Sequence, residues 1–255
     1  MKKRYGQHFL SDTNILRRIV AFAGIGSGDT VVEVGPGAGA LTRELAAAAK
    51  KVIAIEIDHD LIPALREKMP SNVDIIEGDA LDVPFPGTPF HLVGNLPYNV
   101  ATPLFKRFIE HRHVVRNVTV MIQKEVADRM VAGPNDEAYG PLSILIQYYA
   151  TPKIGFTVPP GAFTPRPKVD SAVIRLAWKP GIPDDRPFTD FVQRAFGSRR
   201  KKLLNNLAAI FQEISRETLA AHMHDSNVPV DARPENLSVE AFHRLYNHIV
   251  CTDGD

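Results

Sequence analysis

The stretch TVVEVGPGAGALTRELAAAA, residues Thr30 to Ala49, decides the fold. Its first five residues are rich in β-branched side chains and predict a strand, and its last ten predict a helix. Gly35, Gly37 and Gly39 lie between them, where glycine lets the backbone pass close beneath a ligand. The N-terminus of the following helix would present free N–H groups. The stretch therefore predicts a strand, a ligand-binding loop and a helix in succession.

The same alternation continues along the chain. Further strands are expected at 52–57, 73–77, 90–94 and 118–122, and helices at 59–69, 102–110 and 125–131. Strands separated by single helices imply right-handed crossovers and a mostly parallel sheet covered on both faces. Two later runs, 154–158 and 171–178, could close the sheet as an antiparallel pair. We therefore expect a doubly wound, Rossmann-like α/β fold with seven strands.

The two ends of the chain differ in character. A basic arm, MKKRYGQHFL, opens the sequence, and Asp12 is placed to cap a helix that ends before Gly24. The proline-rich linker KPGIPDDRP, residues 179–187, marks a domain boundary. Helical patterns follow it, ending in a helix that Ser238 can cap. We expect a domain at 1–185 that includes the arm and a small all-helical domain at 186–255.

Composition limits the class of protein. The 255 residues carry a net charge of +1, and 44% of them are hydrophobic, as in ordinary globular proteins. With Cys251 as the only cysteine, no disulfide can form within one chain. The histidine pairs at 111/113 and 222/224 lack matched ligands, so we expect surface residues and no metal site. No secretory signal or membrane-length apolar run is found, which predicts a cytoplasmic protein.

Acidic residues follow the second and third expected strands. Glu56 could accept hydrogen bonds from both ribose hydroxyls of a nucleoside, and Asp79 from an adenine amine. Each could instead be a solvated loop acid or a helix cap. The glycine loop also fits a dinucleotide pattern, but it contains no cation for a pyrophosphate. This absence favours a ligand without phosphate, such as S-adenosylmethionine.

The fourth strand runs into the motif HLVGNLPYNVA, residues 91–101. A nucleobase amine is a poor nucleophile because its lone pair is delocalised into the ring. The Asn95 side-chain oxygen and the Leu96 carbonyl could hold both amine hydrogens, while Pro97 stiffens the turn and Tyr98 offers a stacking face. An ordinary turn with Tyr98 packed in the core is the alternative. The local sequence leaves both interpretations open.

Several ordered blocks give the chain a clear resemblance. GQHFL, EVGPGAGALT, GDAL, NLPYN, QKEVADRM, YGPLSIL, FTPRPKVDSAV and RRKKLLNNL together resemble the bacterial small-subunit (16S) ribosomal RNA adenine dimethyltransferase family. The resemblance spans residues 3 to 245. It implies that S-adenosylmethionine donates two methyl groups to N6 of each of two adjacent adenosines near the 3′ end of 16S rRNA. It also implies a role in small-subunit biogenesis.

The resemblance assigns roles residue by residue. It implies that the target adenine is held at Asn95, Leu96, Pro97 and Tyr98, and that Phe163 closes over the other face of the flipped base. The cofactor site implied by the family comprises His8, Leu10, Gly35, Gly37, Gly39, Glu56, Asp79 and Asn95. Many relatives carry asparagine where this chain has His8, which puts only that detailed contact in doubt.

Cations without neighbouring acids suggest where RNA binds. Arg166 and Lys168 flank the expected pocket, and a later basic segment carries Arg194, Arg199, Arg200, Lys201 and Lys202. A solvated surface is the usual explanation of such a segment, but beside an RNA enzyme it favours phosphate contacts. The expected partner is 16S rRNA in the immature small subunit, bound by a monomer that does not bind a membrane.

Three alternatives remain open. A nicotinamide-dependent oxidoreductase could use the same glycine loop, but it would need a hydride-transfer acid or base where NLPY stands. A noncatalytic ribosome-assembly factor would use the basic surfaces alone. A large-subunit rRNA methylase is the nearest competitor, although NLPYN and RRKKLLNNL look more like the small-subunit enzyme.

Overall fold

A computed structural model describes residues 8–96, 101–183, 185–198 and 201–252 of the chain. The chain forms two compact units. The first comprises residues 1–127 and 151–178, and the second comprises residues 128–150 and 179–255. The expected boundary at residue 185 lies close to the start of the last segment, but residues 128–150 group with the C-terminal helices.

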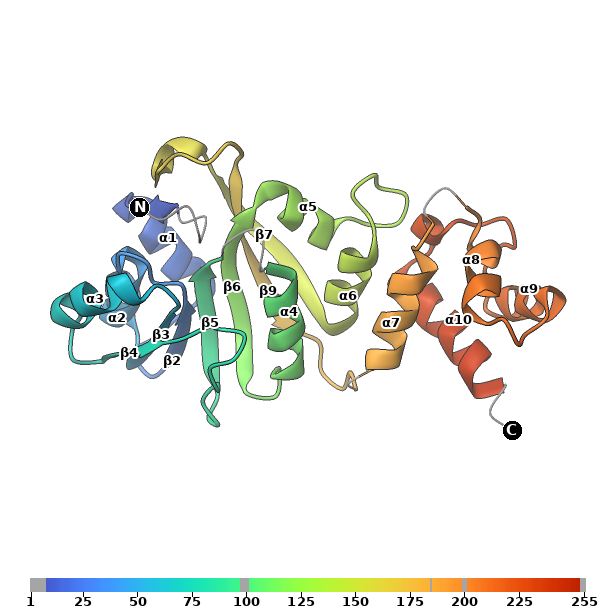
Figure 1. The fold of residues 1–255 in the computed structure, drawn as a ribbon, viewed down its shortest axis with the longest axis horizontal. Helices are drawn as coiled ribbons and strands as arrows, with labels where there is room; N and C mark the ends of the chain where they lie inside the picture. The colour runs from blue at the N-terminus through green and yellow to red at the C-terminus, as the bar shows by residue number, and fades with distance from the viewer. Residues whose placement is uncertain (1–7, 97–100, 184, 199–200, 253–255) are drawn as a thin grey trace. The chain divides into compact units, whose positions relative to one another are not determined.

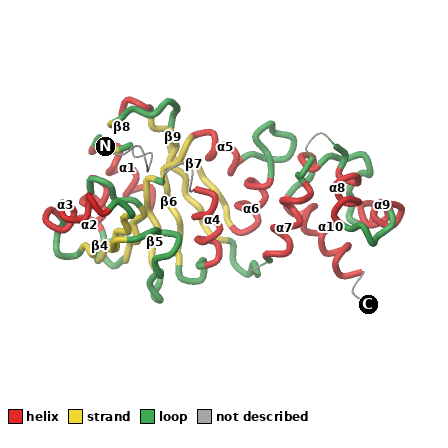
Figure 2. The backbone as a smooth tube through the Cα atoms, in the orientation of Figure 1, coloured by secondary structure: helices red, strands yellow, loops and turns green. Residues whose placement is uncertain are grey.

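A seven-stranded sheet forms the first unit, in the order β4-β3-β2-β5-β6-β9-β7 (Figures 1 and 2). The four contacts that join β4, β3, β2, β5 and β6 are parallel, and β9 runs antiparallel to β6. These features confirm the Rossmann-like fold class. The strand bounds are β2 Thr30–Val34, β3 Lys51–Glu56, β4 Val73–Glu77, β5 Phe90–Asn95, β6 Val115–Gln123, β7 Ala150–Val158 and β9 Ser171–Trp178.

Five helices accompany these strands. Asp12 caps the first, accepting hydrogen bonds from the N–H groups of Asn14 and Ile15 at 2.9 and 3.2 Å, and Gly24 ends it with φ 70°. Both ends agree with the signals in the sequence. The helix bounds are α1 Thr13–Ala23, α2 Ala40–Ala48, α3 Ile62–Lys68, α4 Ala101–Glu110 and α5 Lys124–Val131, the last of which crosses into the second unit.

The core of the first unit lies on both faces of the sheet. Val31, Val93 and Met121 are buried in one cluster with the apolar residues of α1 and α2. Because successive strand residues point to opposite faces, the equally buried Leu92 and Val120 show that the other face is covered as well. The carboxyl ends of the parallel strands are therefore left as the open edge of the sheet.

A two-stranded ribbon that the sequence did not predict brings Phe9 and Leu10, the last residues of the N-terminal arm, to this edge. Its strands are β1 Phe9–Leu10 and β8 Phe163–Thr164, which pair antiparallel with Leu10 opposite Phe163. The pairing places both side chains in the cluster beneath α1. Two segments from distant parts of the chain thus fix the position of residues 8–10.

Helices and aromatic packing build the second unit. The ring centroids of Tyr148 and Phe188 lie 4.6 Å apart, and the hydroxyl of Tyr139 donates to the carbonyl of Leu237 at 2.8 Å. These contacts tie residues 128–150 to the C-terminal helices. The helices are α6 Pro141–Tyr149, α7 Arg186–Ala195, α8 Leu203–Ile210, α9 Arg216–Asp225 and α10 Val239–Thr252.

Two details of this unit differ from the sequence-based expectation. Helix α6 was not predicted, although Pro141 at its first turn is a usual start signal. His222 was expected on the surface, yet it is only 7% exposed, because its position on α9 faces the interior beside Met223.

Ser238 caps α10 as expected, with the N–H of Ala241 donating to its hydroxyl at 3.2 Å. No helix of the described residues is long and apolar enough to cross a membrane.

Candidate active site

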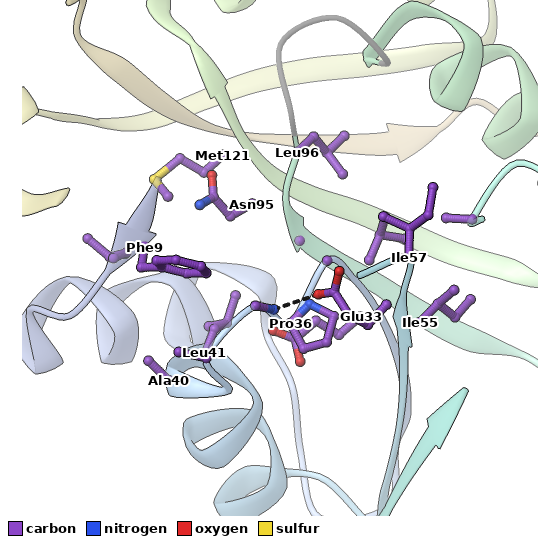
Figure 3. Close-up of a pocket in the computed structure, with 18 of the residues that line it drawn as sticks. Phe9, Glu33, Pro36, Ala40, Leu41, Ile55, Ile57, Asn95, Leu96 and Met121 are labelled. Carbon is purple, nitrogen blue, oxygen red and sulfur yellow. Dashed lines mark hydrogen bonds between the residues drawn. The ribbon is translucent and has the colours of Figure 1, made fainter. Parts of the chain in front are cut away.

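The glycine loop after β2 forms the floor of a pocket at the open edge of the sheet (Figure 3). Gly37 has φ 57°, and a Cβ there would lie 2.8 Å from the ring of Phe9. Gly35 and Gly37 line the pocket. Gly39 does not: a Cβ there would lie 2.5 Å from Met69, so this glycine allows α2 and α3 to pack closely.

Glu56 ends β3, and a hydrogen bond joins its side chain to the backbone of the glycine loop. It is 2% exposed, and its two oxygens accept from the N–H groups of Gly37 and Asp58, both at 2.9 Å. Burial raises the pKa of Glu56, and the hydrogen bonds from Asp58 and Gly37 oppose this shift. Each carboxylate oxygen still has a second acceptor site, as two ribose hydroxyls would require.

Asp79 follows β4 on the same edge. Its Oδ1 accepts from the N–H of Leu81 at 2.8 Å, which closes a tight turn. No described residue donates a hydrogen bond to Oδ2. Asp79, Ala80 and Leu81 all line the pocket, so the free carboxylate oxygen is available to an amine such as that of adenine.

Glu33 is a buried carboxyl that the sequence analysis overlooked. It is 1% exposed at the fourth position of β2, and its Oε2 has no hydrogen-bond partner in the described structure. Burial raises the pKa of Glu33 to about 8, and the Glu56 carboxylate adds to this shift, whereas the Thr42 hydroxyl lowers it. An acid inside an otherwise apolar strand was the available signal. An orphaned carboxyl beneath a pocket suits a ligand that carries positive charge.

Asn95 and Leu96 lie where β5 ends. The Asn95 side-chain N–H donates to the carbonyl of His8 at 2.9 Å. Because that carbonyl can only accept, the amide nitrogen must face His8, and Oδ1 accepts from no described residue. The N–H of Leu96 donates to the carbonyl of Met121 at 3.0 Å, which fixes the peptide unit that follows Asn95.

Residues 8–10, at the end of the N-terminal arm, close one side of the pocket. The His8 ring nitrogen Nδ1 lies 2.7 Å from the carbonyl oxygen of Pro165, and Phe9 and Leu10 line the pocket. In the view of Figure 3, Phe9 and Ile57 lie on opposite sides of the pocket. Apolar wall residues that the sequence did not identify are Phe9, Leu16, Ile19, Leu41, Ile57, Leu104 and Met121.

The remaining expected site residues lie elsewhere. Phe163 is 5% exposed in the core with Leu10 and does not line the pocket, because β8 pairs with β1. A contact with a target base would require this ring to leave its cluster. Pro97, Tyr98, Arg199 and Arg200 lie outside the described residues. Five expected RNA-binding residues are exposed: Arg166, Lys168, Arg194, Lys201 and Lys202.

The chemistry of the pocket matches one kind of ligand. Its lining offers carboxylates for ribose and for an adenine amine, and the buried acid Glu33, which a cationic ligand would favour in its ionised form. No lysine or arginine is among the described lining residues. This donor set fits S-adenosylmethionine, a nucleoside with a cationic tail, better than a dinucleotide. Together with the seven-stranded sheet, it defines an S-adenosylmethionine-dependent methyltransferase.

Comparison with known proteins gives the family. The chain belongs to the ribosomal RNA adenine dimethylase family, whose model matches residues 1–250. A ribosomal RNA small subunit methyltransferase A from Alkaliphilus oremlandii is 44% identical, with 97% of this chain and 91% of the relative covered. The chain is therefore an enzyme that dimethylates adenine in ribosomal RNA.

Solved structures agree with this assignment. A dimethyladenosine transferase from Plasmodium falciparum matches with a TM-score of 0.83 and 27% identity, covering 96% of this chain and 98% of that one. The 23S rRNA methyltransferase ErmE matches with a TM-score of 0.75 and 26% identity, covering 95% and 99%. A nicotinamide-dependent oxidoreductase is excluded by the family.

Proposed function

We propose that this enzyme methylates N6 of two adjacent adenosines near the 3′ end of 16S rRNA in the immature small ribosomal subunit. The observation that carries the proposal is the position of Asn95. Its Oδ1, which accepts from no described residue, lies on the same edge of the sheet as Glu56 and Asp79, where the methyl donor would bind. The 44% identity to a small-subunit methyltransferase, against 26% to the 23S enzyme, favours small-subunit RNA.

Asn95 would act on the lone pair of the target amine. Its Oδ1 and the Leu96 carbonyl accept the two N6 hydrogens, which favours a pyramidal nitrogen whose lone pair faces the methyl group. S-adenosylmethionine supplies that methyl group when bound. The nitrogen loses a proton to solvent after the transfer, so the pocket requires no strong base. The His8 carbonyl would hold the Asn95 amide in this orientation.

RNA would reach the pocket by leaving its stacked helix. An unpaired adenosine costs least to extrude, and positive charge holds the surrounding phosphates. Arg166 and Lys168 on the first unit, and Arg194, Lys201 and Lys202 on the second, are exposed and are proposed as phosphate contacts. We propose that the enzyme binds this RNA as a monomer.

The test is to map the methylated nucleotides. Immature small subunits and large subunits are each incubated with the enzyme and isotopically labelled S-adenosylmethionine, and the modified positions are located by primer extension. The proposal predicts two adjacent labelled adenosines near the 3′ end of 16S rRNA. Label found only in large-subunit RNA would refute it, and the large-subunit alternative would then replace it.

A further inference from the structure

Arg107, on α4, donates hydrogen bonds to the loop that follows β4. Its guanidinium donates to the carbonyl of Ala80 at 2.8 Å and to that of Val83 at 2.5 Å. Both carbonyls belong to the turn that begins at Asp79 and ends at Val83. A planar guanidinium presents its donors at fixed spacing and direction and so holds two carbonyls in one geometry, whereas a lysine ammonium is a single point of charge on a flexible stem.

The loop is built to be held in one position. Asp79 closes the turn from inside, because its carbonyl accepts from the N–H groups of Asp82 and Val83, both at 2.9 Å. Gly78 starts the loop, and a Cβ there would lie 2.5 Å from Val83. The chain therefore folds back tightly between Asp79 and Val83, and Arg107 holds two carbonyls of this turn.

An aromatic residue anchors Arg107 from the other side. The guanidinium carbon lies 4.4 Å from the ring centroid of Phe85, whose ring packs against Phe90 at 5.5 Å and Phe108 at 6.3 Å. Both of these neighbours are fully buried. The cation is thus fixed between a rigid aromatic cluster and two carbonyls, and has little freedom to move.

Helix α4 connects Arg107 to the pocket. Leu104, three residues before Arg107 and so on the same side of the helix, is buried and lines the pocket. The helix begins shortly after Asn95 and Leu96. One rigid element therefore contributes a pocket wall, follows the target-amine motif in the chain, and holds the loop that carries Asp79.

We infer that Arg107 is a positioning residue for adenine recognition: by holding the carbonyls of Ala80 and Val83, it aims the free oxygen of Asp79 at the amine of the cofactor's adenine. The inference rests on the proposed role of Asp79 as the acceptor for that amine. Arg107 itself does not line the pocket; it would act by holding the loop, and its positive charge also interacts with the carboxylates of Asp79 and Asp82.

A purely structural arginine would behave differently. Its loss would lower stability and weaken every ligand alike. A positioning role instead changes the preference between ligands that differ only at the amine. S-adenosylhomocysteine and its purine-riboside analogue form such a pair, because purine riboside carries a hydrogen in place of the amine and is otherwise the same as adenosine.

The test measures both dissociation constants by titration calorimetry on the full chain. The variants are Arg107→Met, which keeps an apolar chain over Phe85, and the more conservative Arg107→Lys. Lys106→Met is the matched control, because it removes the same charge from the neighbouring, exposed position of α4. Thermal denaturation of each variant reports stability separately.

Wild type and Lys106→Met are expected to bind the adenosine ligand at least about tenfold more tightly than the purine-riboside ligand, since the purine-riboside ligand lacks the hydrogen bond from the amine to a charged acceptor. Arg107→Met should reduce this ratio to about twofold or less. Arg107→Lys should lie in between, because its ammonium can donate to these carbonyls but its flexible stem does not fix their positions. An unchanged ratio in both Arg107 variants would overturn the inference. If wild type itself shows no preference, the role of Asp79 fails with it, while mapping of methylated adenosines still tests the proposed function independently.

Discussion

Glutamine at position 56 should separate cofactor binding from chemistry. The Glu56 carboxylate accepts two backbone N–H groups at 2.9 Å each, from Gly37 and Asp58. A glutamine has one acceptor oxygen, so in either orientation its NH₂ group faces one of these N–H donors and cannot accept from a ribose hydroxyl on that side. Losing one hydrogen bond to a charged acceptor costs about 1.5–3 kcal/mol, or about 10- to 150-fold in cofactor affinity.

The assay is titration of S-adenosylhomocysteine into Glu56→Gln, with methyl transfer measured at saturating cofactor. Because Glu56 touches no reacting atom, kcat should stay within about threefold of wild type. Glu77 supplies the control: it is opposite Glu56 in the parallel β3–β4 pair but is exposed and does not line the pocket. Equal cofactor affinity in Glu56→Gln and Glu77→Gln would refute the assignment of the ribose site.

Two further predictions follow from the same pocket. The unfolding free energy of the ligand-free protein should fall by a few kcal/mol as pH rises from 5 towards 8. In the folded protein, burial raises the pKa of Glu33 to about 8, so the side chain stays protonated over this range; in the unfolded chain it loses its proton above about pH 4.5, and this difference favours unfolding as pH rises. Urea titrations should show a smaller decrease for Glu33→Gln, and an equal decrease would contradict the buried acid. Gly37→Ala should weaken cofactor binding more than Gly24→Ala in calorimetry, although both glycines have positive φ, because only Gly37 would crowd Phe9. Equal cofactor affinities of Gly37→Ala and Gly24→Ala would show that the contact between residue 37 and Phe9 does not contribute to cofactor binding.

Much of the site could be predicted because it follows from strand ends. Glu56, Asp79 and Asn95 each follow or end a short β-rich run in the sequence. Parallel strands joined by helices bring their carboxyl ends to one edge. Local patterns and one topological rule were therefore sufficient to predict that Glu56 and Asp79 meet at the glycine loop, whereas the place of Asn95 in the cofactor site came from the family resemblance. The structure brings all three residues to the pocket.

What could not be predicted depends on contacts between distant segments. The β1–β8 ribbon pairs two short strands from opposite parts of the first unit, and two residues are too few for a periodic pattern. That pairing decides that Phe163 lies in the core and that Phe9 lies over Gly37. Arg107 is similar, since nothing in its helix indicates that its side chain holds the carbonyls after β4.

The dimethyladenosine formed by Asn95→Ala tests the central claim most directly. Wild type and variant, both saturated with S-adenosylmethionine, would be incubated with immature small subunits, and N6,N6-dimethyladenosine in the RNA would be measured by nucleoside mass spectrometry. With one acceptor for the target amine removed, we predict at least a roughly hundredfold slower formation of the product, as for other transition-state hydrogen bonds, and cofactor affinity within about threefold of wild type. Dimethyladenosine formed by Asn95→Ala at the wild-type rate would contradict the account.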